Sequence, residues 1–181
     1  MSWKPSHFTY FAYGSNLLTQ RLTAGDRCPS ATPLTTGFLA GHCLMFHKLG
    51  RDGSGKCDVL PTGNLGDRVY GAVFRIAIGD RQNLDRVESL GIGYRAVWVT
   101  VQTPRRPILA LAYRALQTQN NLLPFEWYRQ LVIAGAQEHR LPTTYLNQIS
   151  QVPSMPDPDP WRHQHHMNLL TPKDPPNGHP L

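Results

Sequence analysis

Short apolar and aromatic stretches recur along most of the chain, many of them alternating with polar residues, and Gly, Pro, Asn or Asp bound them. This pattern is typical of β-strands separated by turns. The stretches predicted as strands are residues 8–13, 32–39, 41–48, 59–60, 69–76, 94–102 and 108–115. The last two are joined by the sequence TPRRP, so we expect them to pair as a hairpin.

Four other segments carry a helical pattern of apolar positions: residues 16–24, 79–90, 125–139 and, more weakly, 142–149. The segment 125–139 is the strongest, because its apolar residues share one helical face. They are Trp127, Leu131, Ala134 and Ala136. Ser15 or Asn16 is the expected N-cap of the first helix, and Asp80 that of the second.

The order of these elements indicates the fold class. The strands mostly follow one another and do not alternate with long helices, which argues against a doubly wound parallel sheet. We therefore expect an α+β fold, a small mixed or antiparallel β-barrel of about six or seven strands with helices packed outside.

The composition of the chain changes near residue 150. Residues 1–150 are long enough for one domain with a single core, which we expect to be the functional domain. Residues 151–181 are rich in Pro, Asp and His and bury too little apolar surface to offset chain entropy, so they are expected to be a disordered tail. His163, His165 and His166 could bind a metal ion there, but without a fixed acidic or thiol ligand we expect only adventitious binding.

The formal net charge of +6 raises the question of a nucleic-acid partner. However, the arginines are scattered, and only Arg105 and Arg106 are adjacent, in the TPRRP turn. Without a basic stripe or a nucleic-acid motif, we expect no nucleic-acid partner. The richest apolar run, residues 108–116, is interrupted by Arg114 and is too short to span a bilayer, so no membrane partner is expected. The first residues lack an apolar signal-peptide core, which makes the cytoplasm the expected location.

The cysteines and a glycine-rich stretch are the two further features to weigh as metal or phosphate sites, and neither has the residues that such a site needs. Cys28, Cys43 and Cys57 are odd in number and include no Cys-x-x-Cys pair, so reduced, mostly buried thiols are expected. The sequence GRDGSGKC nearly matches a phosphate-binding loop. Cys57 stands where that loop needs Ser or Thr, and Pro61 follows too soon for a helix, so we predict a hairpin turn.

The stretch YFAYGSNLL, residues 10–18, is the first candidate for chemistry. A glycine at the end of a buried strand allows a sharp turn and the close approach of a ligand. A helix that begins there would present free N–H groups and a partial positive charge, which suit a carboxylate or an oxyanion. An ordinary turn with a capping residue is the alternative.

Glu88, in the sequence LDRVESLG, is the second candidate. On a helix it lies four residues after Leu84, so it points toward the apolar side, and it occupies the last turn, where the helix dipole disfavours an anion. Both effects raise the pKa of a carboxyl group, as a general acid–base near neutral pH requires. The alternative is a surface glutamate that pairs with Arg86 or Arg95.

Three segments together carry a resemblance: YFAYGSNLL, LDRVESLGIGYR and WYRQLVIAGAQEHRLPTTYL. In this order and approximate spacing they resemble the gamma-glutamylcyclotransferase family of the AIG2-like superfamily, over roughly residues 8–150. The third segment points to the gamma-glutamylcyclotransferase branch proper. The resemblance implies a compact mixed β-barrel with helices around it. It also implies a reaction without cofactor or metal that converts gamma-glutamyl amino acids to 5-oxoproline and a free amino acid.

The resemblance also implies roles for residues. The catalytic glutamate of the family falls on Glu88, and a substrate-contacting tyrosine falls on Tyr128. The substrate-binding loop falls on Tyr10, Phe11, Ala12, Tyr13, Gly14 and Ser15, with Asn16 bracing the turn. Tyr94 and Tyr113 are weaker candidates. The family usually has glycine after the catalytic glutamate, where this chain has Ser89, so Gly91 and Gly93 are left to form the turn.

Two alternatives stay open from the sequence. One keeps the fold and Glu88 but uses a gamma-glutamylamine or another gamma-glutamyl conjugate as substrate. The other is a non-catalytic member that only binds small molecules. In each case the expected partner is a small molecule, and the chain is expected to be a monomer or a homodimer.

Overall fold

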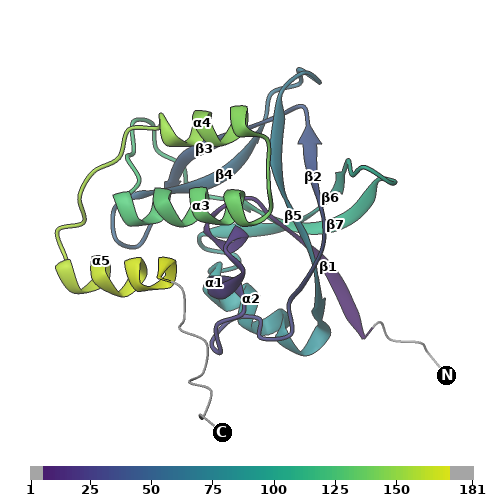
Figure 1. Ribbon diagram of the computed structural model, residues 1–181, viewed down its shortest axis with the longest axis horizontal. Coiled ribbons are helices and arrows are strands. Elements are labelled where there is room, and N and C mark those ends of the chain that lie inside the picture. The colour runs from purple at the N-terminus through teal and green to yellow at the C-terminus, as the bar shows by residue number, and fades with distance from the viewer. Residues whose placement is uncertain (1–5, 172–181) are drawn as a thin grey trace, which may run out of the picture.

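The computed structural model describes residues 6–171, and its strands form two sheets (Figure 1). One has five strands in the order β2-β5-β1-β7-β6, and the other is the hairpin β3-β4. The strands are β1 His7–Ala12, β2 Thr32–Ala40, β3 His42–Leu49, β4 Gly55–Pro61, β5 Arg68–Ala77, β6 Tyr94–Val101 and β7 Ile108–Ala115. Only the β1–β7 pair is parallel, so the larger sheet is mixed. The predicted 94–115 hairpin is confirmed.

The α+β class and the mixed sheet are confirmed, but the predicted β-barrel is not, because the larger sheet does not close on itself. The edge strands β2 and β6 approach each other at one end only, where the bridge between Phe38 and Gln102 carries two backbone hydrogen bonds of 2.9 Å. Gly37 permits this approach, because a Cβ atom there would lie 2.4 Å from the Gln102 carbonyl oxygen. The β3-β4 hairpin forms its own sheet and does not close the gap. Sheet twist therefore brings two corners together without joining the edges.

The helices are α1 Thr19–Leu22, α2 Arg81–Val87, α3 Glu126–Glu138, α4 Thr143–Ser150 and α5 Pro160–Met167, with 3₁₀ turns η1 Ser15–Leu17, η2 Ile78–Asp80 and η3 Asn168–Leu170. Figure 1 shows α3 between α4 and α5, on one side of the larger sheet. Trp127, Leu131 and Ala136 of α3 are buried, as its periodicity predicts. Within residues 6–171, no helix is both long enough and apolar enough to cross a membrane.

The first predicted helix and its predicted cap require correction. Residues 15–22 form η1 and α1, separated at Leu18, whose φ and ψ of −69° and 111° are extended and not helical. Neither Ser15 nor Asn16 caps a helix; the N-cap of η1 is Gly14, and the side chain of Asn16 bonds elsewhere. Asp80 occupies the N-cap position of α2, as predicted, but it makes no capping bond because its carboxylate accepts hydrogen bonds from Ser30.

The prediction of a disordered tail is wrong for residues 151–171. Asp159 caps α5 by accepting hydrogen bonds from the Trp161 and Arg162 N–H groups. The Asp157 carboxylate accepts a hydrogen bond of 2.7 Å from Trp127 Nε1, which anchors the segment to α3. Composition failed as a guide because these residues pack on apolar surface that α3 supplies. Residues 172–181, also predicted to be disordered, lie outside the described residues.

Candidate active site

Glu88 is the residue immediately after α2, where its backbone N–H still bonds to the Leu84 carbonyl. Its carboxylate is half-buried, and Asn16 Nδ2 donates a hydrogen bond of 2.8 Å to Glu88 Oε1. Asn16 Nδ2 also lies 3.2 Å from Tyr10 Oη, and Asn16 Oδ1 accepts from Arg27 at 3.2 Å. Asn16 thus links the carboxylate to a tyrosine and to a cation, which fixes the position of Glu88.

Burial raises the pKa of Glu88, as the sequence predicted. The positive charges of Arg27, Arg21 and Lys48, in that order, and the hydrogen bond from Asn16 act against this effect. Burial therefore keeps the pKa of the Glu88 carboxyl group above its ordinary value, while the nearby cations limit this rise and favour the carboxylate form. This balance suits a group that first accepts and then returns a proton.

A small cavity of about 40 Å³ lies beside Glu88, and we call it the inner cavity. It is lined by Tyr10, Tyr13, Gly14, Ser15, Asn16, Cys57, Glu88, Tyr94, Tyr113 and Tyr128. The peptide groups around Cys57 hold two of these rings: its N–H donates to Tyr128 Oη at 3.0 Å, and Tyr94 Oη donates to its carbonyl at 2.9 Å. Tyr13 Oη donates to the Tyr113 carbonyl. The aromatic lining is consequently rigid.

Gly14 is required by close packing at the end of β1. A Cβ atom there would lie 3.0 Å from Cys57 Cβ and 3.3 Å from Tyr128 Oη. The backbone N–H groups of Gly14 and Ser15 donate to no acceptor within residues 6–171. Both residues line the inner cavity, so their N–H groups are candidate donors to a ligand. The helix dipole invoked from the sequence contributes little, because η1 has only three residues.

A larger cavity of about 280 Å³ adjoins the inner one, and we call it the outer cavity. It shares Ser15, Asn16, Glu88, Tyr94 and Tyr128 with the inner cavity. Its other lining residues are Arg21, Arg27, Lys48, Gly50, Arg51, Asp52, Lys56, Val87, Ser89, Trp127 and His166. Five of these are basic, so the outer cavity is strongly positive.

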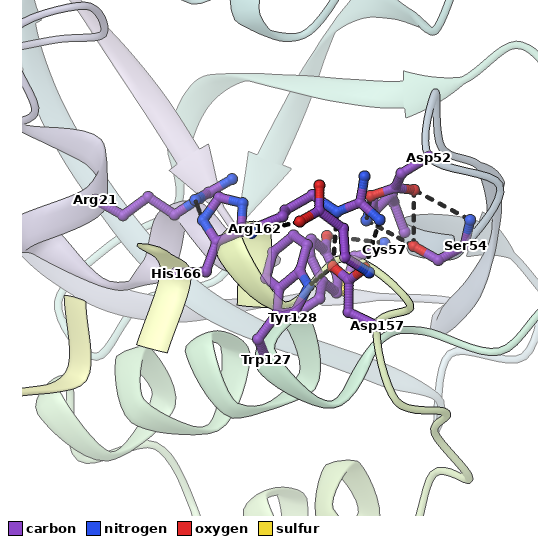
Figure 2. A network of polar contacts seen from close by, with 11 residues as sticks. Arg21, Asp52, Ser54, Cys57, Trp127, Tyr128, Asp157, Arg162 and His166 are labelled. Atoms are coloured by element: carbon purple, nitrogen blue, oxygen red, sulfur yellow. Dashed lines mark hydrogen bonds and ion pairs between the residues drawn. The ribbon is translucent and has the colours of Figure 1, made fainter. Parts of the chain in front are cut away.

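Two parts of the fold that the sequence did not assign to the site line the outer cavity. The turn between β3 and β4, predicted only as a hairpin turn, supplies Arg51 and Asp52. The helix α5 supplies His166, whose ring stacks on Trp127 with centroids 3.8 Å apart and whose Nδ1 lies 3.3 Å from Arg21 Nη1. Figure 2 shows His166 between Arg21 and Trp127, and Asp157 beside Trp127 and Arg162.

Burial and neighbouring cations lower the pKa of His166 to about 3, so the ring is neutral at pH 7. Of the predicted tail histidines, His165 packs edge-on against His166, with ring centroids 5.2 Å apart. No group of three His, Cys, Asp or Glu residues is arranged to hold a metal ion in the part of the chain that the structure describes. The cysteines within it are free, with Cys28 and Cys57 buried and Cys43 partly exposed.

The structure brings together most of the residues singled out in the sequence. Tyr10, Tyr13, Gly14, Ser15, Asn16, Glu88 and Tyr128 line one cavity, as do the weaker candidates Tyr94 and Tyr113. Phe11 and Ala12 do not, because both are fully buried in the core and line neither cavity. The sequence analysis missed Arg21, Arg27, Lys48, Lys56, Cys57 and His166. The sequence carries a signal for two of them only: Arg21 and Arg27 lie close to YFAYGSNLL in the chain.

A cavity of about 510 Å³, larger than both of these, lies elsewhere. It is formed mainly by β3, β5 and α4, with His42, Cys43 and Tyr145 among its lining residues, and it contains none of the candidate residues. Cavity size is therefore a poorer guide here than the combination of a perturbed carboxyl group with convergent hydrogen-bond donors.

Comparisons with known proteins agree with this assignment. A sequence model described as the AIG2-like family matches residues 68–149, which include Glu88. Gamma-glutamylcyclotransferase from Bos taurus is 29% identical over 153 residues, 80% of this chain and 78% of that protein. The human protein of the same name is 28% identical over the same shares. The chain is thus similar to the AIG2-like family over residues 68–149 and to gamma-glutamylcyclotransferases over 80% of its length.

Solved structures show the same similarity. A structure titled gamma-glutamyl cyclotransferase superposes with a TM-score of 0.75 at 26% identity, covering 82% of this chain and 89% of the other. An uncharacterized human protein gives the same TM-score at 27% identity, covering 83% and 90%. The backbone likeness therefore extends over more than four-fifths of this chain.

Proposed function

We propose that this protein is a gamma-glutamylcyclotransferase that converts gamma-glutamyl amino acids to 5-oxoproline and a free amino acid, with Glu88 as general acid–base. The observation that carries the proposal is the position of Glu88. Its half-buried carboxylate, bonded to Asn16, faces a cavity where the N–H groups of Gly14 and Ser15 are free. The family relatives share the named activity.

The reaction needs one proton carrier and one oxyanion site. Glu88 takes a proton from the α-ammonium group of the substrate, and the resulting amine attacks the γ-carbonyl carbon. A C–N bond forms, and the carbonyl electrons move to oxygen, where the Gly14 and Ser15 N–H groups stabilise the negative charge. The oxyanion then collapses, the bond to the leaving nitrogen breaks, and Glu88 donates its proton to that nitrogen. The new ring nitrogen still carries a second proton, which it gives to the Glu88 carboxylate. Glu88 passes this proton to the released amine, which departs as an ammonium ion.

The tyrosines give this reaction its geometry. Both reacting groups belong to one substrate molecule, so holding it in a folded conformation supplies much of the rate. The rings of Tyr94 and Tyr128 are fixed through Cys57, and that of Tyr10 contacts Asn16. A rigid aromatic wall of this size favours the compact conformer in which the α-amine approaches the γ-carbonyl.

The decisive experiment measures 5-oxoproline release from gamma-glutamyl dipeptides and gamma-glutamyl amines by the wild type and Glu88→Gln. The swap keeps the size of the side chain and removes its acid–base function, so kcat should fall about 10²- to 10⁴-fold. A melting-temperature rise with 5-oxoproline in both proteins would show that the cavity remains formed. Equal turnover by both proteins would refute the role of Glu88. No turnover by the wild type, with ligand binding retained, would leave a non-catalytic binding protein.

A further inference from the structure

The outer cavity contains more positive charge than the proposed reaction requires. Lys56 pairs with Asp52 at 2.8 Å. Within residues 6–171, no carboxylate lies in ion-pair distance of Arg21, Arg27, Lys48 or Arg51. Glu88 is the remaining acidic residue of the lining. Four unpaired cations thus face one carboxylate.

Two of these cations are partly or wholly removed from water. Lys48 is only 8% exposed, and its ammonium group lies 5.0 Å from the centroid of the Tyr94 ring. The Nε atom of Arg21 is buried and has no hydrogen-bond partner in the described part of the chain. Burial lowers the pKa of both side chains, that of Arg21 to about 10. Burying cations without partners is unfavourable, so an anionic ligand would relieve the penalty.

The position of this charge relative to Glu88 identifies which part of a substrate it meets. The γ-carbonyl carbon must lie beside Glu88 and the Gly14–Ser15 N–H groups at the inner cavity. The leaving amine then extends into the outer cavity, which is the larger and carries the four cations. The cations of the outer cavity therefore contact the leaving amine of the substrate.

We propose that the preferred substrate is a gamma-glutamyl conjugate whose leaving amine carries two carboxylates, such as an acidic amino acid, recognised by Arg21, Lys48 and Arg51. This inference rests on the proposed function and names its substrate class. A substrate with a neutral leaving amino acid has two carboxylates, one on that amino acid and the α-carboxylate of the gamma-glutamyl group. These two do not neutralise all four cations. A second carboxylate on the leaving amino acid offsets more of the positive charge. Gamma-glutamylamines, which offer no carboxylate on the leaving side, are poor substrates on this view.

The test uses two peptides of equal size that differ in one charge, gamma-glutamylglutamate and gamma-glutamylglutamine. We expect kcat/KM for the first to exceed that for the second about tenfold at low ionic strength. Gamma-glutamyllysine and gamma-glutamylethylamide should be poorer than both. Raising the salt concentration should reduce the ratio, because part of the cavity is open to solvent. A ratio of one or less in the wild type would overturn the inference.

Substitutions in the outer cavity test whether its cations cause the expected kcat/KM ratio. Arg51→Gln, at an exposed position in the β3–β4 turn, should lower the ratio severalfold without unfolding the protein. Lys48→Met, which replaces a buried cation with an apolar chain, should lower it as well. The matched control is Arg105→Gln, which makes the same charge change at an exposed position that lines neither cavity, and it should leave the ratio unchanged. A ratio that persists in both cavity variants would overturn the assignment.

A binding measurement separates this inference from the proposed function. If no peptide releases 5-oxoproline, the proposed function fails. The two peptides should still raise the melting temperature unequally, with the larger rise for gamma-glutamylglutamate. Equal shifts would then overturn the inference as well.

Discussion

The inner and outer cavities meet at Glu88, yet their linings differ in kind. The inner cavity is about 40 Å³, walled by tyrosines that backbone hydrogen bonds hold in place. The outer cavity is about 280 Å³, walled by cations, most of which have no ion-pair partner among the described residues. Rigid neutral walls fix the positions of reacting atoms, whereas unpaired charges select among substrates, and salt weakens their effect. We therefore expect inner-cavity changes to alter kcat and outer-cavity changes to alter kcat/KM for different leaving groups.

The largest effect in this comparison should come from Gly14→Ala, which alters the inner cavity. The added Cβ would lie 3.0 Å from Cys57 Cβ and 3.3 Å from Tyr128 Oη, so one of them must shift. Misplacing the oxyanion donors and Tyr128 should lower kcat about 10²-fold. Steady-state kinetics would check this, with Gly25→Ala as the control, since an added Cβ there meets nothing within 4 Å. Unchanged kcat in Gly14→Ala would show that the inner cavity is less rigid than its contacts indicate.

The next effect concerns the pH profile and tests how the outer cavity acts on Glu88. Burial raises the pKa of Glu88, and Lys48 is among the cations that lower it. The reaction needs the carboxylate, so activity is lost as pH falls through this pKa, above the ordinary value of about 4.3. Removing a cation destabilises the carboxylate, so Lys48→Met should move the acidic limb of kcat/KM upward by roughly half a pH unit. A limb that stays in place or moves downward would contradict the electrostatic link.

A moderate effect on stability is expected from Asp157→Ala, which releases α5 from the outer cavity. Asp157 accepts hydrogen bonds from Trp127 at 2.7 Å and from Arg162 at 2.6 Å. We expect the free energy of unfolding to fall by about 1–2 kcal/mol, because charge-assisted bonds are lost but Arg162 is partly exposed. KM should rise as His166 loses its place on Trp127, whereas kcat should change little. An equally large fall in kcat would mean that α5 also shapes the inner cavity.

The same substitution has a defined pH dependence. Hydrogen bonds from Arg162 hold the pKa of Asp157 well below its usual range. The carboxylate therefore contributes stability above the unfolded pKa of about 3.9, and this contribution is lost as pH falls toward the lower folded value. Urea unfolding of both proteins at pH 7 and pH 3 should show the difference between them shrinking at pH 3.

The smallest effect should come from Ser89→Gly, next to Glu88. Ser89 has a φ of +51°, in the left-handed region that favours glycine. Glycine relieves that strain, but it also adds conformational entropy to the unfolded chain. The net result should be a rise in the free energy of unfolding of about 0.5–1 kcal/mol. Ser89→Ala keeps the strain and serves as the control. A destabilised Ser89→Gly would mean that the serine side chain supports the turn.

The local pattern predicted most of the fold. Alternation located β1, β5, β6 and β7 because one face or both faces of each strand pack on the core, and the 3.6-residue period located α3. Residues 16–24 were predicted as one helix because helix propensity does not reveal that Leu18, between η1 and α1, is extended. The positive φ of Ser89 also escaped prediction, since serine carries no signal for that conformation. Glycine was expected to form that turn, and Gly91, with a φ of +83°, does so in part.

The sequence by itself determined the elements, the glycine that ends β1 and the glutamate that ends α2, because neighbouring residues encode turns, periodicity and helix ends. Only the tertiary structure decided that the sheet stays open and that Arg21, Lys48 and His166 face one cavity. These residues come from α1, β3 and α5. Their meeting depends on how distant elements pack, and no short stretch of sequence records that arrangement.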